Sequence, residues 1–125
     1  MDKTLLITDD SMIIREMIKE VAAASGWRIV AEAENGQEAI ERYQAHRPTA
    51  VTLDLIMPEF DGLHGLKGIR AFDPDAKVLL VSAIDQAKVL REAISGGAAD
   101  FIVKPFEKGR LRDALELLSR QTSAC

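Results

Sequence analysis

Polar residues that could do chemistry follow four of the short apolar runs in the sequence. They are Asp9, Asp10, Asp54, Ser82 and Lys104. If three carboxylates met at one place, they would repel one another and raise each other's pKa unless a cation lay among them. Oxygen ligands with neither sulfur nor imidazole beside them favour Mg²⁺, with Mn²⁺ as a substitute. The set predicts a divalent metal site at which Asp54 could accept a phosphoryl group covalently, provided that the fold brings these residues together.

The apolar runs alternate five times with longer segments of helical period, which predicts an α/β fold. The expected strands are Thr4 to Thr8, Arg28 to Ala33, Ala50 to Leu53, Lys77 to Ser82 and Asp100 to Val103. Such nearly continuous apolar runs suit a parallel sheet that is covered on both faces. Right-handed crossovers favour a doubly wound sheet of order 2-1-3-4-5, whose ligand crevice lies at the carboxyl ends of the strands.

The helices expected between the strands carry their own start and stop signals. They cover approximately Ser11 to Ser25, Asn35 to the residues before Pro48, Leu63 to Phe72, Ile84 to Ser95 and Glu107 to Arg120. Asn35 and Glu38 form a capping box, and Gly26 stands where a left-handed cap would end the first helix. Gly65 and Gly68, inside the third helix, each cost about 1 kcal/mol relative to Ala. They indicate tolerated softness, close packing of helix on sheet, or a deliberately mobile helix.

Composition limits the class of protein. The chain has 125 residues, 47% of them hydrophobic and 29% charged, which fits a single soluble domain over residues 1–125. With 16 basic against 20 acidic residues, the net charge of -4 argues against direct binding of nucleic acid. Cys125 is the only cysteine, so no disulfide framework forms within one chain. No apolar run approaches the roughly 20 residues of a membrane span, and we expect a cytoplasmic protein.

The motifs around the polar residues resemble those of response-regulator receiver domains of two-component signalling. The resemblance extends from about Lys3 to Arg120 and is closest to the stand-alone chemotaxis type, with its flavodoxin-like or CheY-like fold. The matching segments are 5–11 (LLITDDS), 51–58 (VTLDLIMP) with 61–62 (DG), 82–83 (SA) and 101–106 (FIVKPF). The resemblance implies a switch that takes a phosphoryl group from a histidine kinase or a histidine phosphotransfer protein. We expect a signalling protein that catalyses only its own phosphorylation and dephosphorylation.

The resemblance also implies a role for each site residue. Mg²⁺ would be held by Asp9, Asp10, Asp54 and the backbone carbonyl of Ile56. Lys104 and the Ser82 hydroxyl would share the charge of the phosphoryl oxygens. In such domains the hydroxyl moves toward the phosphoryl group and an aromatic side chain, here Phe101, packs into the space it leaves. Ordinary core or edge packing is the alternative for Phe101, and the Lys104–Pro105 peptide could be cis or trans.

Two surfaces are candidates for partner binding. Met12 and Ile13 fall outside the packed stripe of the first helix and would form an apolar patch for a kinase or phosphotransfer helix bundle, unless their exposure is incidental. In the resembling family, the face made by the fourth helix, fifth strand and fifth helix meets the downstream target. Here that face carries Lys88, Arg91, Lys108, Arg110 and Arg112. A solvated charged face is the alternative. We expect the unphosphorylated protein to be a monomer.

Two apolar residues occupy positions that overlook the phosphoryl group in the resembling family. Ile56 and Ile84 lie two residues beyond Asp54 and Ser82. Because neither side chain can hydrogen-bond an attacking water, our hypothesis is that they shield the acyl phosphate from hydrolysis. Simple loop packing would account for them equally well.

Other classes fit less well. A haloacid-dehalogenase-type phosphatase needs two Asp residues two positions apart, whereas Asp9 and Asp10 are adjacent and point in different directions along a strand. Flavodoxin-like cofactor binding is disfavoured because carboxylates at the first turn repel phosphate. A binding-only receiver is disfavoured because every site residue is present. Met1 and the lack of a long polar linker favour a stand-alone messenger over an excised receiver of a larger, for example DNA-binding, regulator.

Overall fold

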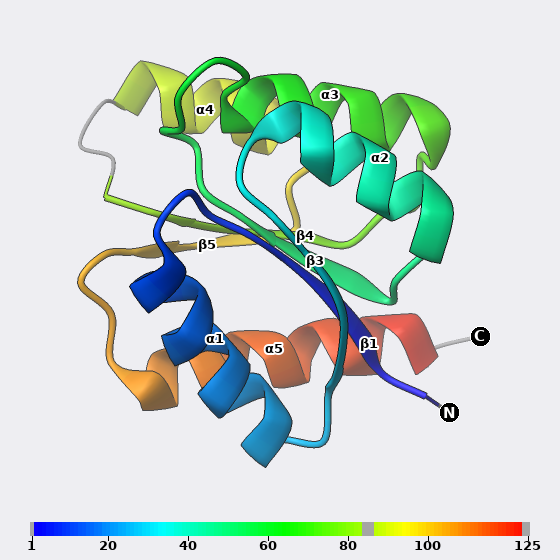
Figure 1. Ribbon diagram of the computed structural model, residues 1–125, viewed down its shortest axis with the longest axis vertical. Coiled ribbons are helices and arrows are strands. Elements are labelled where there is room, and N and C mark those ends of the chain that lie inside the picture. Colours follow the sequence, from blue (N-terminus) through cyan, green and yellow to red (C-terminus); the bar gives the residue numbers. More distant parts are fainter. Residues whose placement is uncertain (1, 84–86, 124–125) are drawn as a thin grey trace.

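A parallel sheet forms the centre of the computed structural model, which describes residues 2–83 and 87–123. Its strands lie in the order β2-β1-β3-β4-β5, as expected. They are β1 (Thr4–Thr8), β2 (Arg28–Ala33), β3 (Ala50–Leu53), β4 (Val78–Ser82) and β5 (Asp100–Val103). One face is covered by α1 (Met12–Ala24) and α5 (Lys108–Ser123), and the other by α2 (Gly36–His46), α3 (Gly62–Phe72) and α4 (Ala87–Ser95) (Figure 1). The predicted fold class is confirmed.

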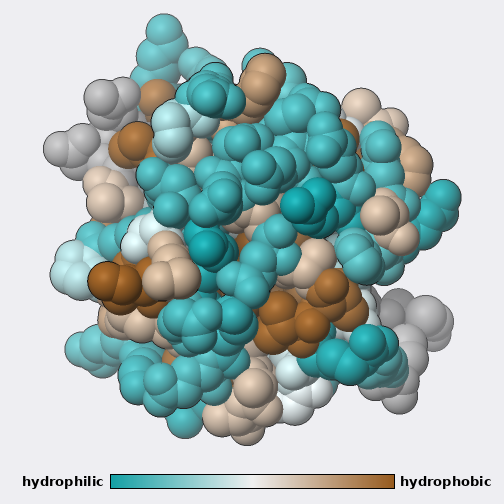
Figure 2. All heavy atoms as spheres, in the orientation of Figure 1, coloured by the Kyte–Doolittle hydropathy of each residue, from teal (hydrophilic) through white to brown (hydrophobic). Residues whose placement is uncertain are grey.

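The two faces of the sheet have separate hydrophobic cores. In β1, Leu5 and Ile7 pack with α1 and α5 residues such as Ile18, whereas Leu6 packs with residues of α2 and α3. Successive side chains of a strand point to opposite faces, so a strand covered on both sides must be apolar throughout. Trp27 is buried in the α1–α5 core. In Figure 2 the visible surface is mostly hydrophilic, with hydrophobic side chains gathered over β2 and near the start of α1.

The helices begin at the caps that the sequence indicates. The Asn35 side chain accepts a hydrogen bond from the Glu38 amide at 2.9 Å, and the Glu38 carboxylate accepts one from the Glu34 amide at 3.1 Å. This is a capping box whose return bond falls one residue earlier than the usual pattern. Ser11 caps α1, and Gly26 follows that helix with a positive φ of 88°, as expected. The N-caps therefore fix the residue at which each of these loops ends and its helix begins.

The glycines of α3 allow close packing against α2. A Cβ atom on Gly65 would lie 3.1 Å from the Gly36 Cα, and one on Gly68 would lie 2.2 Å from the Ile40 Cδ1. A Cβ atom on Gly62 would lie 2.2 Å from the carbonyl oxygen of Asp54. Close packing of helix on sheet was one of the expected explanations, and a Cβ on Gly65 would lie 3.4 Å from Cδ1 of Leu53 in β3. The tightest neighbours, however, are α2 and the loop after β3.

The other differences from the expected elements are small and lie at their ends. β4 begins at Val78 instead of Lys77, and α5 extends to Ser123. The fourth helix, expected from Ile84, is described over Ala87–Ser95, and residues 84–86 lie outside the described residues, so the proposed shielding role of Ile84 has no structural account. None of the helices over residues 2–83 and 87–123 has the length and apolar character that crossing a membrane requires.

Candidate functional site

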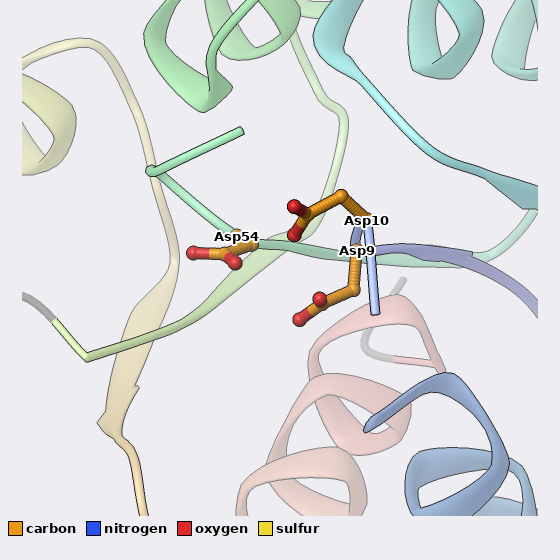
Figure 3. A group of neighbouring side chains, drawn as sticks. All are labelled: Asp9, Asp10 and Asp54. Atoms are coloured by element: carbon orange, nitrogen blue, oxygen red, sulfur yellow. The ribbon is translucent and has the colours of Figure 1, made fainter. Parts of the chain in front are cut away.

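The backbone ladder of the sheet places two acidic residues side by side at its carboxyl edge. The Asp9 amide donates to the carbonyl of Ala33 at 3.0 Å, and the Asp54 amide donates to the carbonyl of Thr8 at 3.1 Å. Both bonds extend the pairing of the strands one residue beyond β1 and β3. Figure 3 shows the side chains of Asp9, Asp10 and Asp54 gathered at this edge. One carboxylate oxygen from each lies within 4.8 Å of the others, which confirms the expected cluster.

Lys104 joins the cluster from the end of the edge strand β5. It follows β5, and its amide donates to the carbonyl of Ser82 at 3.0 Å. The ammonium lies 2.6 Å from Oδ2 of Asp9 and 3.0 Å from Oδ2 of Asp54. The Lys104–Pro105 peptide, which the sequence left open, is cis. A single side chain therefore bridges the carboxylates that follow β1 and β3.

The other oxygen of Asp54 has two further donors. The Ser82 hydroxyl lies 2.9 Å from Oδ1, and the Ile56 amide donates to the same atom at 3.1 Å. Asp54 is only 4% exposed, so a carboxylate at this place needs such partners. The donors hold the carboxylate in one orientation at the centre of the site.

Burial and charge act in opposite directions on the site's ionisable groups. Burial raises the pKa of Asp9 by more than the hydrogen bonds from Lys104 and Ser11 lower it. For Lys104, burial works against the charged form, but the hydrogen bonds that its ammonium donates to the Asp9 and Asp54 carboxylates raise its pKa above the ordinary value. One ammonium facing three carboxylates leaves the site with excess negative charge.

The donor set fits a hard divalent cation. All three side chains of the cluster offer carboxylate oxygens, and no His or Cys belongs to it. Mg²⁺ prefers oxygen ligands and is commonly held by one or two carboxylates together with water. The exposure of Asp10 leaves room for water on one side of the cluster. The residues present therefore suit the metal that the sequence predicts.

The two components expected of the switch take different positions. The Ser82 hydroxyl lies at Asp54, while Phe101 lies at the surface with 37% of its area exposed. Phe101 is on β5 opposite Leu80 of β4, and its carbonyl accepts a hydrogen bond from Arg110 at 3.1 Å. In this conformation the Phe101 side chain is partly exposed on the edge strand β5.

The structure separates the residues expected at partner surfaces. Met12 and Ile13 are 64% and 72% exposed and line a shallow groove along α1. Lys88 and Arg91 line a groove on α3 and α4. Lys108 lies elsewhere, because its ammonium reaches Glu20 of α1 at 3.0 Å. α4 and α5 lie on opposite sides of the sheet and flank the edge strand β5 (Figure 1), where the Arg110 guanidinium of α5 lies 3.7 Å from the Asp100 carboxylate of β5, so the face expected from the sequence stays a prediction.

Sequence reasoning missed Arg15. Its side chain is 11% exposed, and Nη1 donates to the carbonyl of Asp9 at 2.7 Å. The signal was its position three residues before Ile18 and seven before Ala22, on the buried stripe of α1. A charged residue on such a stripe needs buried partners, and here one of them belongs to the site.

Comparisons with known proteins agree with this geometry. The family model described as response regulator receiver domain matches residues 5–116. The chemotaxis protein CheY of Listeria monocytogenes is 52% identical over 112 residues, which cover 90% of this chain and 94% of that protein. The CheY of Thermotoga maritima is 42% identical over 120 residues, covering 96% of this chain and 100% of that protein.

A solved structure is similar over most of its length. The crystal structure of the CheX-CheY-BeF3-Mg+2 complex from Borrelia burgdorferi contains a chain that is 30% identical, with a TM-score of 0.89. The match covers 94% of this chain and 89% of that one. Taken with the sheet order and the acidic cluster, these similarities show that the chain belongs to the response regulator receiver domain family and is of the CheY type.

Proposed function

We propose that this chain is a phosphorylation-activated switch in which Asp54 accepts a phosphoryl group from a histidine kinase or a histidine phosphotransfer protein. The observation that carries the proposal is the buried Asp54 carboxylate, which faces both the Lys104 ammonium and the Ser82 hydroxyl. The CheY relatives favour chemotaxis or a similar two-component pathway. The switch would act as one domain in the cytoplasm, monomeric before phosphorylation. The same chemistry would serve a receiver within a larger regulator.

The transfer is a nucleophilic displacement at phosphorus. A carboxylate oxygen of Asp54 attacks the phosphorus, the phosphorus–nitrogen bond of phosphohistidine breaks, and the imidazole leaves with the electron pair. Asp54 then carries an acyl phosphate. Lys104 and Ser82, at 3.0 Å and 2.9 Å from the Asp54 oxygens, would bind the oxygens of the transferred group.

The acidic cluster would supply the metal site for this reaction. Asp9, Asp10, Asp54 and the backbone carbonyl of Ile56 would hold Mg²⁺, for which Mn²⁺ could substitute. When bound, the ion neutralises negative charge on the phosphoryl oxygens. The support is the set of carboxylate oxygens within 4.8 Å of one another.

Residues around the cluster would control the lifetime and the output of the phosphorylated state. Ile56 is 60% exposed two residues after Asp54, where an apolar side chain would keep water from the acyl phosphate. The Ser82 hydroxyl would bind the phosphoryl group as Phe101 moves inward from its exposed position. This movement would change the surface of α4, β5 and α5.

Two sets of exposed residues would bind the partners. The downstream protein target would contact Lys88, Arg91 and Lys108. Because Lys108 lies on the other side of the sheet from the two α4 residues, such a target would have to reach around the edge strand β5. The phosphoryl donor would contact Met12 and Ile13, the exposed apolar pair on α1.

The proposal is tested by intact-protein mass after incubation with acetyl phosphate, with and without Mg²⁺. We expect one Mg²⁺-dependent phosphoryl adduct on the wild type and none on Asp54→Asn. The matched control is Asp113→Asn, the same change at an exposed position on α5, which should be labelled like the wild type. An adduct that persists in Asp54→Asn would contradict the proposal.

A wild type without any adduct has two interpretations, which phosphate release separates. Steady release of inorganic phosphate would indicate a phosphatase-like site that turns over rapidly. If no phosphate is released, labelling by a phosphorylated histidine phosphotransfer protein decides between a receiver that needs its protein donor and a binding module.

A further inference from the structure

Arg15 is a buried cation that contacts the backbone of the acidic pair. Its side chain, in the first turn of α1, is 11% exposed, and Nη1 donates to the carbonyl oxygen of Asp9 at 2.7 Å. That oxygen belongs to the peptide group that joins Asp9 to Asp10. A peptide group is planar, so a hydrogen bond to its oxygen restricts the rotation of the whole plane.

An ion pair with β2 holds Arg15 in place. Its Nε lies 2.9 Å from Oε1 of Glu32, and Oε2 of the same carboxylate lies 2.8 Å from the Lys19 ammonium. Burying a guanidinium is unfavourable unless it is paired and hydrogen-bonded, so the Glu32 contact favours one orientation of the side chain. The next residue of β2, Ala33, accepts the hydrogen bond from the Asp9 amide. β2 therefore supports Asp9 directly through Ala33 and indirectly through Glu32 and Arg15.

Asp10 depends on this support more than the other two carboxylates do. Asp54 and Asp9 both accept hydrogen bonds from Lys104, whereas in the described part of the chain no hydrogen bond or ion pair holds the Asp10 carboxylate. The direction of the Asp10 side chain toward Asp54 in Figure 3 is therefore set by the backbone. The peptide plane bound by Arg15 is the one that leads into Asp10.

We propose that Arg15 is a positioning residue for the metal site, which orients Asp10 through the Asp9–Asp10 peptide. The inference rests on the proposed function, because it concerns how the chain prepares the site for Mg²⁺. It predicts a change in Mg²⁺ affinity opposite in direction to the change that loss of the Arg15 charge alone would produce. Removing a positive charge near a cation site should strengthen cation binding if Arg15 acts only through its charge. If Arg15 positions Asp10, the same change should weaken Mg²⁺ binding.

The experiment is a Mg²⁺ titration by isothermal calorimetry on the wild type and three variants. Arg15→Met removes the charge and the hydrogen bonds, and Arg15→Lys keeps the charge but cannot reproduce the forked contacts with Asp9 and Glu32. Lys19→Met is the matched control, because it removes a cation from the same Glu32 carboxylate without any contact to Asp9. Thermal unfolding followed by circular dichroism shows that each variant is folded.

We expect Arg15→Met to weaken Mg²⁺ affinity about tenfold, the lower end of the range for residues that orient metal ligands. Arg15→Lys should also weaken it, and Lys19→Met should leave it unchanged or slightly tighter. Unchanged or tighter binding in Arg15→Met would overturn the inference. If Arg15→Met does not fold, unchanged binding in Arg15→Lys would overturn it. A wild type that binds no Mg²⁺ would overturn the proposed metal site itself, and the inference with it.

Discussion

Asp9 and Asp10 are neighbours in the sequence, yet their carboxylates lie in opposite environments. Asp9 is 1% exposed and receives hydrogen bonds from Lys104 and from the Ser11 amide. Asp10 is exposed. Adjacent residues at the end of a strand point in different directions, so one carboxylate enters the sheet edge while the other faces solvent. The pair can therefore combine a fixed, buried ligand with one that stays hydrated, which suits a metal that keeps part of its water shell.

The buried carboxylate makes stability depend on pH in the absence of metal. Because the pKa of folded Asp9 is raised above its ordinary value of 3.8, the folded state holds this proton more tightly than the unfolded state. Rising pH then removes stability from the wild type until Asp9 is fully ionised. The stability of Asp9→Asn relative to the wild type should therefore increase as the pH rises above the ordinary pKa of 3.8, measured by urea unfolding with a chelator present.

Asp73 provides a control, because its pKa is shifted in the opposite direction from that of Asp9. The hydrogen bond from Tyr43 lowers the pKa of Asp73, so its contribution to stability is present above the ordinary pKa and is lost as the pH falls. Asp73→Asn should therefore lose stability relative to the wild type as the pH rises from below 3.8 to about 5, and the difference should stay level at higher pH. A flat or falling difference for Asp9→Asn would contradict the prediction.

At the scale of elements, α3 contacts both the loop after β3 and α2 through its glycines. Gly62→Ala should destabilise the protein by about 1–3 kcal/mol, because its Cβ would meet the backbone of Asp54 and Leu55 in a packed region. Gly68→Ala should change stability much less, because its Cβ meets only the Ile40 side chain, which can rotate, and Ala favours helix by about 1 kcal/mol. Urea unfolding measures both. Equal losses in the two variants would contradict this account of the α2–α3 contact.

The elements also show which features of the molecule local sequence can predict. The strands were predicted nearly to the residue because each coincides with a continuous apolar run. The start of α2 was predicted because the Asn35 side chain bonds to backbone only three residues away. The acidic cluster followed from the rule that parallel strands end at one edge. The contact of Gly68 with Ile40 and that of Arg15 with Asp9 were not predicted, since each depends on how a helix packs against segments beyond it. Helix rotation and packing are set by the whole core.

At the scale of the molecule, the two layers of helices separate the candidate partner surfaces. Met12 and Ile13 of α1 lie on one side of the sheet, next to the acidic pair, and α4 with Lys88 and Arg91 lies on the other (Figure 1). The site sits at the edge between the layers, where β1 and β3 end. A phosphoryl donor bound to α1 would therefore leave the α4 surface open to a target.

Because the surfaces lie apart, we expect that a mutation on α1 can weaken docking of the phosphoryl donor without slowing the phosphorylation reaction itself. Ile13 is 72% exposed, and a charge there would prevent burial of the apolar patch against a donor protein. Ile13→Glu should slow phosphotransfer from a phosphorylated histidine phosphotransfer protein about tenfold, which corresponds to about 1.4 kcal/mol of lost docking energy. Labelling by acetyl phosphate, which needs no docking surface, should stay at the wild-type rate. Intact-protein mass over time measures both reactions.

The control for this prediction is Ile94→Glu, the same change at a residue of α4 that is 44% exposed. It should leave both reactions at the wild-type rate, because α4 lies on the other layer of the molecule. A loss of acetyl phosphate labelling in Ile13→Glu would mean that the change had damaged the site rather than the docking surface. Equal slowing of protein-donor transfer in the two variants would place the donor on a broader surface than α1, and would remove the physical basis for assigning separate surfaces to donor and target.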